Sequence, residues 1–217
     1  MEKKDLVIFW DWNGTIVDDC FVFVDILNCL LKENNLPLIS TEQYKNTFCF
    51  PIKSFYKKIN LYKNLKFFNQ INLRFAELYK EKMFSPLLKQ NIVSFLSLLQ
   101  KEGVQQYIVS AQNHKVLVDL ISYYGLSKYF IDVFGVNNHI AKGKDVVALN
   151  LKNKIANNKK IFFIGDTALD LEVSNTIQAT PLLVTWGHYS KKRLVENINK
   201  KYVFSSVGSL KKHVLSL

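Results

Sequence analysis

Four short apolar runs constrain the fold of this chain most strongly. Each is too brief for a helix and is rich in β-branched or aromatic residues, which is typical of strands buried on both faces of a parallel sheet. The runs cover residues 6–10, 107–109, 161–164 and 182–185. Segments with helical spacing separate them, as at residues 91–101, 114–124 and 144–155. This alternation predicts an α/β fold with a doubly wound, Rossmann-like parallel sheet.

The chain length between the first and second runs indicates an insertion. About 95 residues separate the two runs, whereas a simple crossover unit needs only about 30. Residues 20–36 and 63–83 carry apolar residues at helical spacing. We therefore expect a small α-helical cap domain at residues 18–85, inserted into a Rossmann-like core made of residues 1–17 and 86–217.

Composition excludes several classes of protein and partner. With 217 residues, 48% hydrophobic residues and only 8 Gly and 4 Pro, the chain has the composition of a globular protein, not of a collagenous or disordered one. The net charge is +11, but the lysines are dispersed and form no basic stripe interleaved with aromatic residues. We therefore expect no nucleic-acid partner.

The apolar runs and the cysteines bear on location. No stretch approaches the roughly 20 apolar residues that a membrane span needs, so no membrane association is expected. The three cysteines show no CxxC spacing, which indicates neither a disulfide framework nor a zinc site. A reducing cytoplasm fits this cysteine usage best.

Polar residues follow three of the apolar runs. In an open parallel sheet, ligands bind beyond the carboxyl ends of the strands, so these residues are expected to converge at one edge. Carboxylates that face each other repel unless a cation lies between them, and oxygen ligands at such an edge suit Mg²⁺. A site of this kind accepts a phosphate. The residues concerned are Asp11, Asn13, Gly14, Thr15, Ser110, Gly165, Asp166, Thr167 and Asp170.

These residues also resemble the motifs of a known family. Asp11-Trp-Asn-Gly-Thr15, Ser110, a downstream Lys and Gly165-Asp-Thr-Ala-Leu-Asp170 are similar, in order, to the four motifs of the haloacid dehalogenase superfamily in its phosphatase branch. A cap inserted between the first two motifs is also that family's pattern. The resemblance to phosphoglycolate-phosphatase-like members covers essentially the whole chain. It implies a hydrolase of phosphomonoesters.

The resemblance implies roles for the residues that react and hold the metal. Asp11 would be the nucleophile that forms an aspartyl-phosphate intermediate. Mg²⁺ would be held by Asp11, the backbone carbonyl of Asn13 and Asp166, with Asp170 helping directly or through water. The substrate would be a small phosphorylated metabolite, over which the cap closes.

The same resemblance implies which residues hold the phosphate. Ser110 and the backbone N–H groups that follow it, beginning with Ala111, would bind phosphate oxygens, and Thr15 is a further substrate-binding candidate. Ser110 could instead serve only as the N-cap of the next helix. A lysine would neutralise the phosphate charge. Lys144, which begins the next helix, is preferred over Lys142.

Asn13 departs from the family pattern. Most of these phosphatases carry a second Asp there, which protonates the leaving oxygen and then deprotonates the attacking water. An amide can do neither, although its backbone carbonyl can still bind metal. Asp18, Asp19 or a cap residue could substitute. The alternatives are a catalytically weakened phosphate-binding or regulatory protein, a phosphotransferase, or a C–P bond hydrolase with a Schiff-base lysine such as Lys53, Lys57 or Lys58.

Two further features concern substrate and partners. The segment Trp186-Gly187-His188 follows the fourth run and resembles a loop that borders the active site in related phosphatases, so His188 is a candidate substrate contact. The predicted cap is rich in Phe and Tyr. These side chains are expected to form its small core or a homodimer face, rather than a ligand cage.

Overall fold

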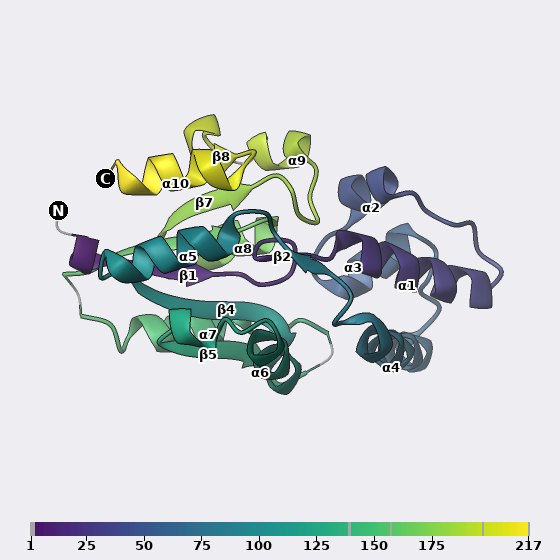
Figure 1. Ribbon diagram of the computed structural model, residues 1–217. Helices are drawn as coiled ribbons and strands as arrows, with labels where there is room; N and C mark the ends of the chain where they lie inside the picture. Colours follow the sequence, from purple (N-terminus) through teal and green to yellow (C-terminus); the bar gives the residue numbers. More distant parts are fainter. Residues whose placement is uncertain (1–2, 139, 157, 197, 217) are drawn as a thin grey trace.

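The core of the protein is one parallel sheet, seen in a computed structural model that describes residues 3–138, 140–156, 158–196 and 198–216. The strand order is β5-β4-β1-β6-β7-β8, and every neighbouring pair is parallel. The predicted Rossmann-like α/β fold is therefore confirmed (Figure 1). In chain order the strands are β1 Leu6–Trp10, β4 Gln105–Asn113, β5 Asp132–Val136, β6 Lys160–Gly165, β7 Thr180–Val184 and β8 Val203–Phe204.

The sequence predicted four of these strands and missed β5 and β8. Both lie at the edges of the sheet. β5 carries a glycine and an exposed aspartate, and β8 has only two residues. An edge strand is covered less completely than a central one, so neither shows the continuous apolar run that marks a buried strand.

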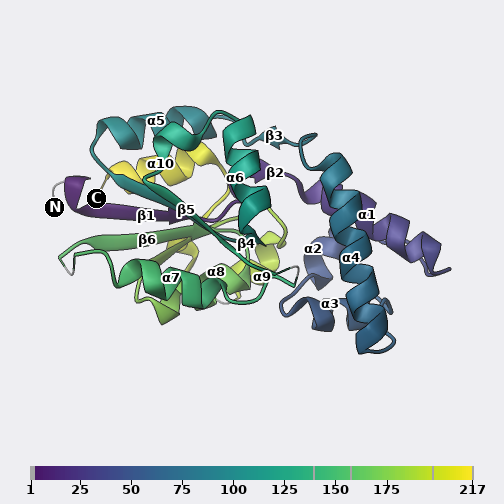
Figure 2. The same ribbon diagram turned by 90° about the horizontal axis from the view of Figure 1, so that it is seen from below.

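Helices cover both faces of the sheet (Figure 2). Helices α5, α6 and α10 lie on one side of the strands, and α7 and α8 lie on the other. Short 3₁₀ turns occur at Lys3–Asp5, Ser127–Tyr129 and Lys200–Tyr202. The core helices are α5 Ile92–Lys101, α6 His114–Tyr123, α7 Lys144–Lys152, α8 Ala168–Thr176, α9 Lys191–Val195 and α10 Val207–Leu215.

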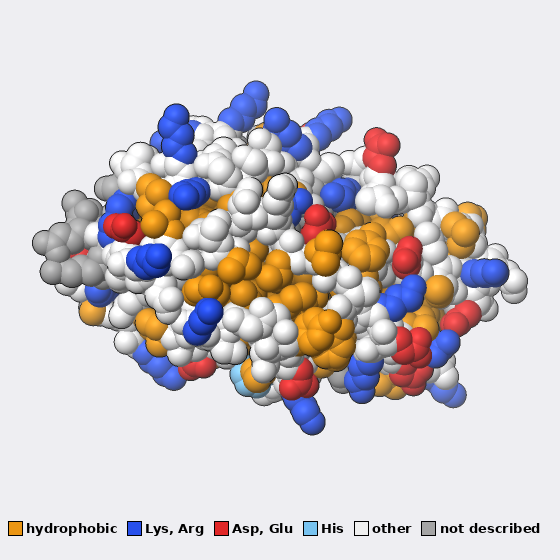
Figure 3. All heavy atoms as spheres, viewed as in Figure 1, with side chains coloured by type: hydrophobic (Ala, Val, Ile, Leu, Met, Phe, Trp, Pro, Cys, Tyr) orange, Lys and Arg blue, Asp and Glu red, His pale blue; other side chains and the backbone are white. Residues whose placement is uncertain are grey.

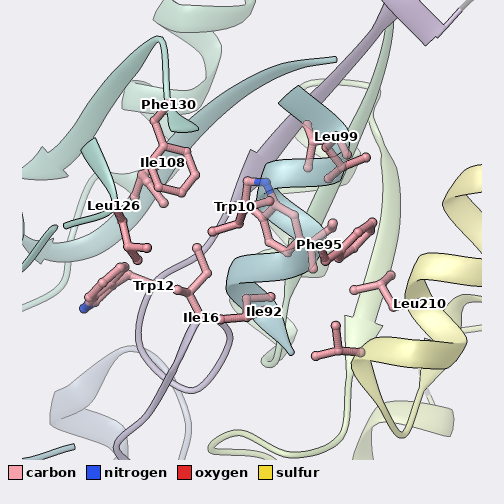
Figure 4. Close-up of a cluster of buried hydrophobic side chains, with 14 of the residues drawn as sticks. Trp10, Trp12, Ile16, Ile92, Phe95, Leu99, Ile108, Leu126, Phe130 and Leu210 are labelled. Carbon is pink, nitrogen blue, oxygen red and sulfur yellow. The ribbon is translucent and has the colours of Figure 1, made fainter. Parts of the chain in front are cut away.

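Side chains of β1 divide between the two apolar layers because successive residues of a strand point to opposite faces. Leu6, Ile8 and Trp10 pack with the layer beneath α5, α6 and α10, whereas Val7 and Phe9 pack with α7 and α8. All five are fully buried. Figure 4 shows Trp10 beside Phe95 of α5, with Trp12 and Ile16 continuing the same cluster. The central strand is thus fixed from both sides, and it ends at Trp10, directly before Asp11.

A helical region is inserted between β1 and β4, as predicted. Its helices are joined to the core by a short antiparallel pair, β2 Val17–Asp18 with β3 Leu87–Leu88. We propose that the cap comprises residues 18–85 and the core residues 1–17 and 86–217. The helices of this region are α1 Cys20–Glu33, α2 Thr41–Thr47, α3 Ile52–Lys58 and α4 Leu65–Lys82.

The aromatic residues of the insertion form an apolar core of their own. Tyr44, Phe48, Phe55, Tyr56 and Phe68 are all buried in one cluster with α1 and α4. This agrees with the expectation that they build the core of the cap, but four of the five also line a cavity, so the expectation that they take no part in a ligand site is not confirmed. Apolar side chains also reach the surface between α5, α6 and β3 (Figure 3). Within the described residues, no helix combines the length and apolar character needed to cross a membrane.

Candidate active site

Three carboxylates meet at the carboxyl edge of the sheet. Asp11 directly follows β1, Asp166 directly follows β6, and Asp170 lies in the first turn of α8. Because β1 and β6 are neighbours in the sheet, the two strand ends bring the first two together. One oxygen from each of the three lies within 4.8 Å of the others, and all three residues are buried.

One buried ammonium joins two of these carboxylates. Nζ of Lys144, the first residue of α7, donates to Oδ1 of Asp11 at 2.5 Å and to Oδ1 of Asp170 at 2.6 Å. Its side chain is 2% exposed. Lys142, the other candidate, is exposed, and its backbone bonds to the side chain of Asn138. The structure therefore brings Lys144, and not Lys142, to the carboxylates.

The acidic charge of the site exceeds its basic charge. Burial raises the pKa of Asp11 to about 6, although Lys144 opposes the shift. Burial, with the repulsion of Asp11 and Asp170, raises the pKa of Asp166 to about 8, although His188 opposes that shift. When ionised, three carboxylates against one ammonium leave two negative charges unbalanced. A buried set of oxygen ligands with two excess negative charges fits a divalent cation.

Asp170 is the most fully hydrogen-bonded of the three. Its Oδ2 accepts bonds from the backbone N–H groups of Asp166 and Thr167 and from the Thr167 hydroxyl, while its Oδ1 accepts from Lys144. These bonds hold the loop after β6 and orient the lysine. The freer carboxylates are Asp11 and Asp166. The hydroxyl of Thr15 lies 3.4 Å from both Oδ2 of Asp11 and Oδ1 of Asp166.

Two glycines leave room for the Asp166 carboxylate. Gly14 has φ +73°, and a Cβ built there would lie 2.5 Å from Oδ2 of Asp166. A Cβ on Gly187 would collide with the same oxygen. The backbone N–H of His188 donates to that oxygen at 2.5 Å. Any side chain at either glycine would therefore displace a carboxylate of the proposed metal site.

The predicted phosphate-binding residues lie at different depths. Ser110 and Ala111 line the cavity above the carboxylates, and Ser110 Oγ accepts from the backbone N–H of Gln112. Both belong to β4, which runs on to residue 113. The alternative role of Ser110 as a helix N-cap is wrong, because the side chain of Asn113 caps α6. Thr15 is fully buried and lies outside the cavity lining.

Asn13 is tied into a polar network between core and cap. Its Nδ2 donates to Oδ2 of Asp19 at 2.6 Å and to the Tyr79 hydroxyl of α4 at 3.3 Å. Asp19, which is 1% exposed, also accepts from the backbone N–H of Gly14 and contacts Nε2 of His188. The other ring nitrogen of His188 bonds to the hydroxyl of Tyr44. His188 is thus a buried link between cap and core as well as a wall residue of the cavity.

The sequence pointed to some members of this network and missed others. The sequence indicates Asp19 as a substitute acid or as the start of the first cap helix, and His188 as a substrate contact. The structure has Asp19 at the N-cap of α1, with no capping bond from its side chain. Tyr44 and Tyr79 were missed, because each lies on an amphipathic cap helix and nothing in the local sequence distinguishes it from a core tyrosine. Their burial raises the pKa of both phenols above the ordinary value.

A cavity of about 170 Å³ lies between the carboxylates and the inserted helices. The core side of its lining includes Asp11, Asn13, Ser110, Lys144 and Asp166. The cap side is mostly apolar, and includes side chains from α1, α3 and α4. A ligand in this cavity would touch the carboxylate cluster at one end and the cap at the other.

Comparison with known proteins identifies the family. The family model described as haloacid dehalogenase-like hydrolase matches residues 7–184. The chain belongs to the haloacid dehalogenase-like hydrolases. The match includes Asp11, Ser110, Lys144, Asp166 and Asp170, together with the inserted helices. The buried acidic cluster fits the divalent-metal site that membership of this family suggests.

Solved structures share this fold over nearly their whole length. A predicted phosphatase from Clostridium acetobutylicum superposes with a TM-score of 0.83 at 19% identity, covering 98% of this chain and 99% of that one. A predicted phosphoglycolate phosphatase from Haemophilus somnus 129pt gives 0.75 at 18% identity, with coverage of 98% and 99%. Protein Tyrosine Kinase A from Mycobacterium tuberculosis gives 0.79 at 14% identity, with coverage of 96% and 97%.

These similarities establish the fold alone, because the differently named proteins superpose almost equally well. No curated protein matches the chain. The activity of this haloacid dehalogenase-like hydrolase must therefore be argued from its own residues.

Proposed function

We propose that the protein is a Mg²⁺-dependent phosphatase that hydrolyses a small phosphorylated metabolite through an aspartyl-phosphate on Asp11. The observation that carries the proposal is the contact of Lys144 with both Asp11 and Asp170, beside Asp166, at the floor of a cavity. This arrangement supports the proposal, because it would bring a carboxylate nucleophile, a fixed positive charge and a cation site around one point. A phosphoryl group bound there would have its charge balanced on several sides.

Each residue of the site has a distinct role in the proposed reaction. Asp11 attacks phosphorus with one carboxylate oxygen, and Lys144 holds that carboxylate and faces the phosphoryl oxygens. Asp11, the backbone carbonyl of Asn13 and Asp166 would hold Mg²⁺, with Asp170 orienting the loop and Lys144. When bound, Mg²⁺ supplies positive charge that offsets the phosphoryl oxygens. Ser110 and the N–H of Ala111 would bind phosphoryl oxygens, and the cap would exclude water from the cavity.

The test is phosphate release from a panel of phosphomonoesters, with and without Mg²⁺, by the wild type and Asp11→Asn. The wild type should release phosphate only with Mg²⁺, and Asp11→Asn should abolish release. Mass spectrometry of quenched reactions should find a phosphoryl adduct on Asp11. Asp25→Asn, at an exposed position of α1, is the matched control and should keep wild-type activity. Turnover that survives Asp11→Asn would contradict the proposal.

A second candidate function is phosphate binding with little turnover. The hydrogen bond from Asn13 to Asp19 favours this second function, because an amide held by a buried carboxylate offers no proton to a leaving group. Asn13→Asp separates the two functions. If the wild type binds phosphate but is inert, and Asn13→Asp gains turnover, then the natural role is binding or regulation.

Two other reaction types are less well supported by the geometry. A C–P bond hydrolase would need a cap lysine in the cavity. Lys53 and Lys57 lie over the ring of Tyr62, and neither they nor Lys58 line the cavity. Borohydride trapping with substrate would detect a Schiff base on any of them. A phosphotransferase would show transfer of the phosphoryl group from Asp11 to an added alcohol in preference to water.

A further inference from the structure

The two walls of the cavity differ in chemistry. The core wall carries the carboxylates and Lys144, whereas the cap wall is built from rings and aliphatic side chains. Among the described residues that line the cavity, the cap contributes a single charged side chain, Lys80, which is exposed to solvent. The apolar cap residues are Phe23, Leu27, Phe48, Phe50, Ile52, Phe55, Phe75 and Ala76, with the rings of Tyr44, Tyr56 and Tyr79.

Three polar groups of the cap wall already bond within the protein. The Asn72 amide donates to the backbone carbonyl of Phe68. The Tyr44 hydroxyl bonds to His188, and the Tyr79 hydroxyl accepts from Asn13. Apart from the exposed ammonium of Lys80, this wall offers a carboxylate or a sugar hydroxyl few partners to replace its bonds to water, at a cost of about 1–3 kcal/mol for each unpaired group. The wall therefore disfavours polar leaving groups and accepts an apolar one.

The volume limits the size of that apolar group. The cavity offers about 170 Å³ to the phosphoryl group and the leaving group together, whereas an engineered apolar protein cavity that binds benzene alone has roughly 150 Å³. The space beside the rings of the cap therefore admits no more than about one six-membered ring. Phe23, Phe75 and Tyr79 already contact one another in tilted, edge-on and stacked pairs, with centroids 5.5–6.4 Å apart. A ligand ring would extend this arrangement.

The chemistry at Asn13 makes an independent demand on the leaving group. The Asn13 amide has no acidic proton to give, and Asp19 behind it is already held by Asn13, Gly14 and His188. An alkoxide leaving group, whose basicity is near that of hydroxide, needs such a proton, since water has a pKa of about 15.7. A phenol has a pKa of about 10, so a phenolate departs without prior protonation.

From these two observations we propose that the substrates are aryl phosphates, the phosphomonoesters of phenols carrying about one ring. This inference rests on the proposed phosphatase function and names its substrate class. An oxygen lone pair of Asp11 forms the new O–P bond while the P–O bond to the ring breaks. The electron pair of that bond leaves with the phenolate, which takes a proton from solvent after release. A water oxygen then bonds to phosphorus while the Asp11 O–P bond breaks, which regenerates the Asp11 carboxylate and yields inorganic phosphate, and the proton lost by the water passes to solvent.

Binding can be measured without turnover by using phosphonates, which have no P–O–aryl bond to break. Isothermal titration calorimetry of the Mg²⁺-loaded protein should show phenylphosphonate binding at least about tenfold more tightly than methylphosphonate. Phe75→Ala should remove most of that difference while leaving methylphosphonate unaffected. Phe84→Ala is the matched control, because Phe84 is a half-exposed ring outside the cavity that contacts Tyr123. Equal binding of the two phosphonates would overturn the inference.

Kinetics test the leaving-group argument with matched esters. Phenyl and cyclohexyl phosphate carry rings of similar size but very different leaving groups, and glycerol phosphate carries a polar one. We expect kcat/KM for phenyl phosphate to exceed both others by at least about 100-fold, and Asn13→Asp to raise the cyclohexyl rate most, since an acid helps a poor leaving group by about 10²- to 10⁴-fold.

The outcomes separate the two proposals. Faster hydrolysis of glycerol phosphate or cyclohexyl phosphate than of phenyl phosphate would overturn the aryl assignment and leave the phosphatase standing. Tight phenylphosphonate binding without hydrolysis of any ester would support aryl recognition and overturn the phosphatase. Failure of both binding and hydrolysis would overturn both.

Discussion

The core and the inserted helices contribute to one cavity in opposite ways. The core supplies charges that are fixed at strand ends and in the first turns of helices, as with Asp11, Asp166 and Lys144. The inserted helices supply buried rings that pack on one another as a small apolar core. If the protein is the phosphatase proposed above, the core half would serve any phosphoryl group and the cap half would select the group attached to it. The predictions below test this division, beginning with the largest effect.

Removal of the buried ammonium should damage the core half most. In Lys144→Met, the carboxylates of Asp11 and Asp170 lose their counter-charge, and the loss of one fixed positive group facing a reacting phosphate costs about 10²- to 10³-fold in kcat. Lys142→Met, at an exposed position only two residues away, should be nearly neutral. Steady-state kinetics of both variants measures the difference. Equal losses would show that Lys144 has no special place in the site.

The pH dependence of metal binding tests whether the carboxylates form a cation site. The pKa values of Asp11 and Asp166 are raised in the folded, metal-free protein. Between about pH 4 and 8, the folded protein therefore keeps protons on these carboxyls that the unfolded chain has already lost. Stability of the metal-free protein should therefore fall as pH rises through this window.

Because Mg²⁺ binds the ionised cluster, it should reverse that trend. At a Mg²⁺ concentration 100 times its Kd, Tm should rise by about 5–10 °C near pH 8.5. The rise should be smaller near pH 6, where protons compete with the cation. Differential scanning calorimetry with Mg²⁺ or EDTA measures both. Asp166→Asn should remove the Mg²⁺ effect, and a Tm rise that is independent of pH would argue against this site.

Two adjacent aspartates test the junction between core and cap. The Asp19 carboxylate contacts Asn13, Gly14 and His188. In Asp19→Asn one carboxylate oxygen becomes an NH₂ group, so one of these buried donors loses its acceptor, and the free energy of unfolding should fall by about 1–3 kcal/mol. Asp18→Asn breaks only a partly exposed pair with Lys89, which is worth at most about 1 kcal/mol. Urea denaturation of both variants gives the comparison. A larger effect at Asp18 would place the junction elsewhere.

The smallest effect is expected on the cap side. Tyr44→Phe keeps the ring of α2 but removes the hydroxyl that bonds to His188. Its loss should reduce the free energy of unfolding by about 1 kcal/mol. Tyr123→Phe, on a ring that is 60% exposed, should change it very little. If thermal denaturation finds the two variants alike, the hydroxyl of Tyr44 contributes nothing to holding the cap.

The sequence predicted the parts of the molecule that depend on local pattern. Apolar runs followed by Asp11 and Asp166 marked the central strands and their polar ends, because a buried parallel strand needs an unbroken apolar sequence. The edge strands β5 and β8 were not predicted, because they are partly exposed or very short and so lack an unbroken apolar run. Ser110 was expected at a strand end, but β4 continues to residue 113 through an irregularity in its pairing with β5.

Contacts between distant segments could not be predicted. Tyr44 meets His188 across 144 positions of sequence, and Tyr79 meets Asn13 across 66. Helical spacing shows that such a tyrosine faces inward, but it does not say which loop lies opposite. The preference for Lys144 over Lys142 came from the resemblance to the family, and the geometry agrees with it.

The positions of the three tryptophans determine which events their fluorescence can report. Trp10 and Trp12 are fully buried in the core cluster. The indole N–H of Trp186 donates to the backbone carbonyl of Thr15. Its ring lies under the ammonium of Lys89, the residue that follows β3 at the base of the insertion. No tryptophan lines the cavity as described, whereas three tyrosines do. Tryptophan fluorescence should therefore report unfolding of the core and rearrangement at the base of the cap, while occupation of the cavity should change tyrosine emission first.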